Sequence, residues 1–158
     1  MAGYGDDAGF EAWLIDNGHA VPEGVVPVAA LRQRGSAYID GLYGPRFSGL
    51  PTGGFTQERA WPRTGATAHG QSIPDTLVPA AIIQASYAAA LQEALKPGAL
   101  AASASQANAV KRKKVEGLEK EYFEGSGDAL ADATIKLSVV EGLVSPYLTQ
   151  PLPAVFVV

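Results

Sequence analysis

The residue types most often used in catalysis and metal binding are sparse in this sequence. It has no cysteine, which excludes disulfides, thiolate zinc sites and cysteine nucleophiles. Its two histidines, His19 and His69, lie in glycine-containing segments without carboxylate partners at the spacing of a motif such as HExxH. A serine nucleophile with His69 as its base is conceivable, but no GxSxG-like context surrounds any serine. We therefore expect surface histidines, no metal site, no cofactor and no enzymatic activity.

One basic cluster, Lys111-Arg112-Lys113-Lys114, has the residue types that contact DNA phosphates, and Trp61 and Tyr122 could stack on bases. The alternative is a strand whose charges pair with Glu119 and Glu121, and a tryptophan that packs in a core or interface. A net charge of −4 and a pI near 5.1 favour this alternative, because DNA-binding domains usually present a net basic face. The glycines at 49, 53 and 54 are not followed by the GK[ST] of a phosphate-binding loop.

The basic cluster lies in a predicted β-hairpin with a two-residue turn at Glu116-Gly117. This turn places two apolar pairs and two opposite-charge pairs across the strands: Val115 with Leu118, Lys114 with Glu119, Arg112 with Glu121 and Val110 with Phe123. The like-charged pair Lys113 and Lys120 disagrees with this register.

Apolar periodicity predicts three helices before the hairpin, over Asp6–Asn17, Val28–Tyr43 and Pro79–Leu95. The first carries Phe10, Trp13 and Leu14 on one stripe and ends at Gly18; the second carries Leu31, Tyr38, Ile39 and Leu42. The third carries an apolar stripe made of Ile83, Tyr87, Leu91 and Leu95. The alanines on either side of this stripe let neighbouring elements approach closely. Gly35 and Gly41 are expected to weaken the second helix by about 1 kcal/mol each.

A short fourth helix is predicted at about Val139–Ser145, with Val140, Leu143 and Val144 facing inward. Ser138 and Glu141 have the spacing of a capping box. Between the second and third helices, residues 46–78 are rich in glycine and proline and leave room only for a helical turn around Gln57–Trp61. A loop of this length is usually functional or mobile.

The last ten residues are apolar but contain Pro151 and Pro153, which forbid a helix. We interpret them as an extended arm that binds a partner, either the edge of a neighbour's sheet or a groove. The residues expected to make that contact are Leu152, Val155, Phe156, Val157 and Val158. The alternative is that the arm folds back onto its own helices.

Together these patterns predict a mainly α fold: a small bundle of about four helices with long loops and a β-hairpin between the third and last helices. Residues 1–148 form a single domain and residues 149–158 the arm. No apolar run approaches the roughly 18 residues of a membrane span. Residues 1–7 lack the basic and apolar regions of a signal peptide, so we expect synthesis in the cytoplasm.

The order of several segments resembles a family of tailed-phage proteins that serve as head–tail connector adaptors and are often labelled DnaT-like single-stranded-DNA-binding proteins. The resemblance covers roughly residues 56–148 and rests on Ala60-Trp61-Pro62-Arg63-Thr64-Gly65, Ile73-Pro74-Asp75, Val78-Pro79 before an alanine-rich helix, the segment 110–122 and Val140-Glu141-Gly142-Leu143-Val144-Ser145-Pro146-Tyr147-Leu148. Each motif is loose alone, and their order makes them specific. The linker at Pro22–Pro27 and the stretch 44–55 depart from the family pattern.

The resemblance implies a structural adaptor subunit of the virion neck, made in the host cytoplasm, that assembles as a dodecameric ring on the portal protein. The ring would extend the DNA channel and provide a docking surface for the next neck or tail protein, while packaged DNA passes without tight binding and no membrane is involved. The alternative function is a phage replication protein that binds single-stranded DNA, with Lys111, Arg112, Lys113 and Lys114 as its DNA contacts.

Overall fold

The computed structural model describes residues 2–21, 24, 26–101, 113–115, 118–120 and 136–149. Within these ranges the protein is mainly α, as predicted, with four α-helices and three short antiparallel strand pairs. The helices are α1 (Asp7–Asp16), α2 (Val28–Tyr43), α3 (Ala80–Leu95) and α5 (Ser138–Val144). The strands are β1 (Leu50–Pro51), β2 (Arg63–Thr64), β3 (Thr67–Ala68), β4 (Gln71–Ser72), β5 (Lys113–Val115) and β6 (Leu118–Lys120).

Helix α1 begins and ends as the sequence predicts. The Asp6 carboxylate accepts a hydrogen bond from the Gly9 N–H at 2.7 Å and caps the first turn. At the other end Gly18 adopts a φ of +70°, and the N–H groups of Gly18 and His19 donate to the carbonyls of Ile15 and Leu14. This is a Schellman ending, in which the left-handed residue is glycine because a Cβ is disfavoured there.

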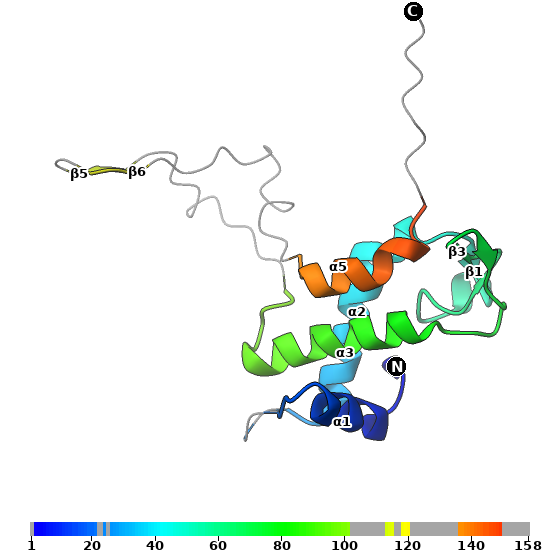
Figure 1. Ribbon diagram of the computed structural model, residues 1–158, viewed down its shortest axis with the longest axis horizontal. Coiled ribbons are helices and arrows are strands. Elements are labelled where there is room, and N and C mark those ends of the chain that lie inside the picture. Colours follow the sequence, from blue (N-terminus) through cyan, green and yellow to red (C-terminus); the bar gives the residue numbers. More distant parts are fainter. Residues whose placement is uncertain are drawn as a thin grey trace, which may run out of the picture.

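Helix α3 lies at the centre of the fold. In Figure 1, α5 and α1 lie on opposite sides of α3, and α2 crosses it. Tyr87 and Leu91 of the predicted stripe are buried, but Leu95 is 58% exposed. The predicted stripe is therefore only part of the buried surface of α3. Other faces of the helix are buried as well, through Ile82, Ala85 and Ala89.

Two apolar clusters fill the space on either side of α3. One joins α1 to α2 and α3 and contains Phe10, Leu14, Leu31, Tyr87, Ala90, Leu91 and Ala94. The larger one joins α2, α3 and α5 to the central loop and includes Ile39, Tyr43, Phe47, Trp61, Ile82, Val140 and Val144. The inward orientation predicted for Val140 and Val144 is therefore confirmed.

Helices α2 and α3 cross at Gly35. A Cβ at this position would lie 2.2 Å from the Ser86 carbonyl oxygen and 2.8 Å from the Ala90 nitrogen. Ser86 and Ala90 are themselves small and buried, so the two backbones approach closely. Gly35, which the sequence marks as a weakness of α2, is therefore a packing requirement, whereas Gly41 faces open space.

The central loop, residues 46–78, contributes to the core. Trp61 is 2% exposed and packs edge-on against Phe47 and Tyr147, with ring centroids 5.5 and 5.8 Å away. The expected core position of Trp61 is confirmed, and its side chain is too buried to stack on a base. The loop is held in place partly by the pairing of Phe47 with Leu148.

Two local predictions are wrong. Residues 57–61 form no helical turn; a 3-10 turn lies at Gly54–Thr56, because the Gln57 side chain bonds the backbone at Gly53, Arg59 and Pro62. The capping box is also absent, because α5 starts at Ser138 and Leu137 takes the N-cap position without a side-chain hydrogen bond.

The β-hairpin is confirmed in its register. Val115 pairs with Leu118, Lys114 with Glu119 and Lys113 with Lys120. The like-charged pair therefore does not shift the register. The two outer pairs, Arg112 with Glu121 and Val110 with Phe123, lie outside the described residues.

The helix crossing gives a stability prediction with a matched control. Gly35→Ala should lower the free energy of unfolding by about 1–3 kcal/mol, because the new methyl group collides with the α3 backbone. Gly41→Ala, on an exposed face of the same helix, should raise it by about 0.5–1 kcal/mol. Urea unfolding of both variants measures the difference, and equal effects would show that the crossing is not close-packed.

Candidate functional site

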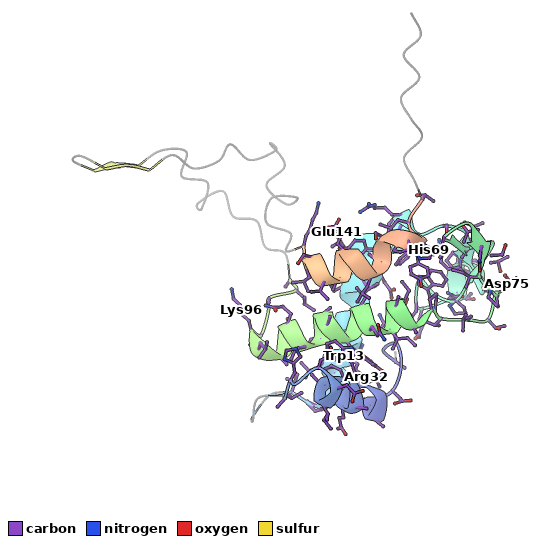
Figure 2. The ribbon with its side chains drawn as sticks, in the orientation of Figure 1. Trp13, Arg32, His69, Asp75, Lys96 and Glu141 are labelled. Carbon is purple, nitrogen blue, oxygen red and sulfur yellow. The ribbon has the colours of Figure 1, made fainter. Side chains whose placement is uncertain are left out.

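Arg32 on α2 fixes the amino-terminal segment of the chain. Its buried guanidinium donates to the carbonyls of Gly3, Tyr4 and Gly5 at 2.8–3.3 Å, and its Nε donates to the Asp7 carboxylate at 2.6 Å. Residues 3–5 have no regular secondary structure, so their carbonyls need partners from a side chain. Arg32 supplies these partners and ties the segment to α2 (Figure 2).

A second polar cluster joins the amino-terminal segment, α2 and the central loop. The Tyr4 hydroxyl donates to the Asp40 carboxylate and accepts from the backbone N–H of Trp61 at 3.1 Å. Arg59 donates to Asp40 at 3.2 Å and to the Ala2 carbonyl at 2.9 Å. The side chains of Asp40 and Arg59 are 17% and 10% exposed, so this ion pair is largely shielded from water.

Arg63 plays the same part inside the central loop. It is buried, and its nitrogens donate to the carbonyls of Phe47, Ser48, Gly49 and Ala60 at 2.6–3.3 Å. Burial lowers the pKa of its guanidinium. Arg63 thus organises irregular backbone and presents no charge to a ligand.

Burial raises the pKa of four tyrosines. For Tyr4 the removal of water is reinforced by the negative charge of Asp40, and for Tyr43 burial raises the pKa to about 12. The pKa values of Tyr38 and Tyr87 are also raised by burial. Each hydroxyl therefore stays protonated in the folded state at pH values where the unfolded chain ionises.

The two histidines lie apart from these clusters. His69 is exposed in the β3–β4 turn with a φ of +51°, and it lines a shallow hollow of about 520 Å³ with residues of the central loop and 146–149. His19 follows α1 and lies 6.3 Å from the Trp13 ring. Among the described residues no group of three or more His, Asp or Glu could hold a metal ion, and none of the helices there could span a membrane.

The structure leaves most of the predicted contact residues undescribed. Lys111 and Arg112 lie outside the described residues, and Lys113 and Lys114 are placed only as backbone partners in β5. All five proposed arm residues lie outside as well: Leu152, Val155, Phe156, Val157 and Val158. Their roles remain predictions.

The arginine contacts were missed by sequence reasoning. Arg32 follows the core residue Leu31 in an amphipathic helix, and periodicity gives no sign that its guanidinium turns inward. Arg63 lies in a segment without periodicity. The only available signal was the abundance of glycine and proline nearby, which predicts irregular backbone whose carbonyls require partners.

The described residues thus define a small, mainly α-helical protein in which the largely buried side chains of Arg32, Arg59 and Arg63 bind backbone carbonyls. A family model described as "Putative DnaT-like ssDNA binding protein" matches residues 3–158, so the chain belongs to that family. The match therefore includes the linker at 22–27, the stretch 44–55 and the last ten residues, all of which lie outside the resemblance in residues 56–148. No curated protein and no solved structure matches the chain.

The Tyr4 cluster predicts a loss of stability in alkali. The folded state keeps Tyr4 protonated above pH 10.0, where the unfolded chain has lost that proton, so the free energy of unfolding falls as the pH rises past that value. Tyr4→Phe should cost about 1–3 kcal/mol at neutral pH, because the Trp61 N–H loses its acceptor, and should make the alkaline decline shallower. Urea unfolding across this pH range measures both; an unchanged slope in the variant would contradict the assignment.

Proposed function

We propose that the chain is a structural head–tail adaptor of a tailed phage, forming a ring on the portal protein. The observation that carries this proposal is that most arginine side chains in residues 26–101 are buried or paired with a carboxylate. Arg32 and Arg63 are buried, the Arg59 side chain is only 10% exposed, and half-exposed Arg34 pairs with Glu93 at 3.1 Å. Of the six lysines and arginines in this range, only Arg46 and Lys96 are exposed without such an ion pair in the structure. Exposed positions of the described residues instead include large apolar side chains: Ile15, Leu50, Phe55 and Val139.

Such a surface suits contacts between proteins better than contacts with phosphate. Nucleic-acid affinity comes largely from lysine and arginine on the surface, and much of this charge is used internally. The net charge of −4 adds a weak repulsion, which suits a channel through which DNA slides. The resemblance in residues 56–148 is what suggests the proposed partners: the portal, further copies of the chain and the next neck or tail protein.

The second candidate function, binding of single-stranded DNA, is favoured by the family description and by the basic cluster Lys111–Lys114. Lys113 and Lys114 of this cluster are backbone-paired with a strand that contains Glu119. A binding site would also need aromatic platforms, and Trp61 is buried. Tyr122 lies outside the described residues.

The adaptor proposal predicts assembly on a template. With the portal protein of the same phage, the chain should be retained in a pull-down and form a ring, whereas alone it should be a monomer or a mixture by light scattering. Ring closure adds many weak side-to-side contacts at once, which explains the need for a template. Failure to bind that portal would contradict the proposal.

The apolar arm has a matched variant in the same experiment. Thr149 donates from its N–H and hydroxyl to the Arg46 carbonyl at 2.8 and 3.0 Å, and Leu148 pairs with Phe47. A chain that ends after Thr149 keeps these contacts. It should keep its melting temperature but should no longer bind the portal protein in the pull-down. Unfolding of this shortened chain would instead place the arm in the core.

The two functions predict different affinities for DNA. On the adaptor proposal, single-stranded oligonucleotides bind no better than about 10⁻⁴–10⁻⁶ M at physiological salt, the range of non-specific binding. Fluorescence anisotropy with the chain and with a variant carrying alanine at positions 111–114 measures this. Nanomolar, salt-sensitive binding that the variant loses would establish the DNA-binding function instead.

A further inference from the structure

The central loop presents an apolar tip to solvent. We define the tip as Leu50, Phe55 and Leu77, which are 74%, 101% and 49% exposed. Phe55 is thus as exposed as the side chain of a free peptide. Large apolar groups held in water in this way are typical of contact sites between proteins.

The tip is held in a fixed conformation by its own hydrogen bonds. The Gln57 side chain accepts from the Gly53 N–H at 2.8 Å and donates to the carbonyls of Arg59 and Pro62. The Thr52 hydroxyl donates to the Asp75 carbonyl at 2.8 Å and joins the segment that carries Leu77 to the same loop. A preorganised loop loses little conformational entropy on binding, which favours its use as an anchor.

The charges beside the tip are acidic. Glu58 and Asp75 are exposed, whereas two of the three arginines of this loop, Arg59 and Arg63, have largely buried side chains. The third, Arg46, is exposed where the loop begins. A surface that receives the tip should therefore combine an apolar floor with a basic rim.

Such a surface lies at the far end of α3. A hollow of about 570 Å³ opens between α2 and residues 98–101 and is lined by Ala37, Tyr38, Leu100 and Ala101, with Arg34 beside them. Arg34 is 49% exposed in its side chain, and exposed Lys96 follows α3 at the same end. A buried cavity of about 150 Å³ holds benzene, so this hollow has room for a phenyl ring.

The hollow is a built feature of the fold. The buried carboxylate of Glu93 accepts hydrogen bonds from the N–H groups of Gly98 and Leu100 at 2.9 and 3.3 Å, and it pairs with Arg34. These contacts hold the turn after α3 against α2. Arg34 and the apolar floor are therefore fixed relative to each other.

We propose that the tip of one copy enters the hollow of the next, with Phe55 on the apolar floor and Glu58 and Asp75 facing Arg34 and Lys96. Figure 2 shows Asp75 and Lys96 at opposite ends of α3, which at 16 residues spans about 24 Å. Two different surfaces at opposite ends make a head-to-tail contact, and repetition of such a contact forms a ring when the rotation between neighbouring copies closes. This inference rests on the proposed ring assembly and names the contact that forms it.

Because the chain has no cysteine, disulfide trapping tests this contact directly. Phe55→Cys places a thiol on the tip and Ala37→Cys places one in the hollow; both positions are exposed, so neither change should disturb folding. A mixture of the two proteins under mild oxidation should form a mixed dimer. The double variant should form a ladder of linked oligomers.

Ala12→Cys is the matched control, because Ala12 is an exposed alanine on α1 away from the hollow. Phe55→Cys should link to Ala37→Cys several-fold faster than to Ala12→Cys, and high salt should slow only the first reaction. Equal rates for the two partners would overturn the inference. So would an Ala37→Cys thiol that a maleimide cannot reach, because the hollow is then filled by the chain itself.

Portal binding separates the failure of this inference from failure of the proposed function. If the chain forms a ring on the portal and Phe55→Cys shows no preference for Ala37→Cys, the ring exists but uses another contact. If the preferred link forms and no portal binds, the head-to-tail contact stands and the adaptor function is wrong.

Discussion

The close crossing of α2 and α3 is the constraint on which the rest of the fold depends. Gly35 lies against the Ser86 carbonyl and the Ala90 backbone, leaving no room for a side chain. The two helices thereby form a single scaffold, and each side of it has an apolar surface against which another helix packs. Helix α1 packs against one side through Phe10 and Leu14, and α5 packs against the other through Val140 and Val144. Loss of this close approach would separate both apolar clusters at once.

Around this scaffold, arginine side chains supply hydrogen bonds to backbone carbonyls that helices or strands would otherwise supply. Arg32 holds the amino-terminal segment and Arg63 holds the central loop, in each case through several backbone carbonyls. Buried carbonyls without partners would cost free energy, so these contacts allow two irregular segments to pack like regular ones. They also withdraw positive charge from the surface. The same residues that stabilise the fold thus leave fewer cations on the surface of the described residues, which supports the proposed role in protein contacts.

The sequence predicted those features that repeat with a period or follow local rules. The bounds of α2, the ending of α1 at Gly18 and the register of the β-hairpin depend on neighbours in the chain, and all three are confirmed. Features that depend on residues far apart were missed. The need for Gly35 comes from α3, and the position of Arg63 comes from carbonyls up to 16 residues away. The apolar tip was hidden for the same reason, because the exposure of Phe55 follows from the fold of the whole central loop.

We propose that the chain is a structural part of the phage virion. The most direct test is whether the protein is present in purified virions and where in the virion it lies. Mass spectrometry of phage virions purified through a density gradient, with gold labelling of the same particles, measures this. The adaptor account predicts the chain in every intact virion, at a copy number matching the portal, with the label at the neck between head and tail. Absence from purified virions, with the protein found only in infected cells bound to single-stranded DNA, would contradict it.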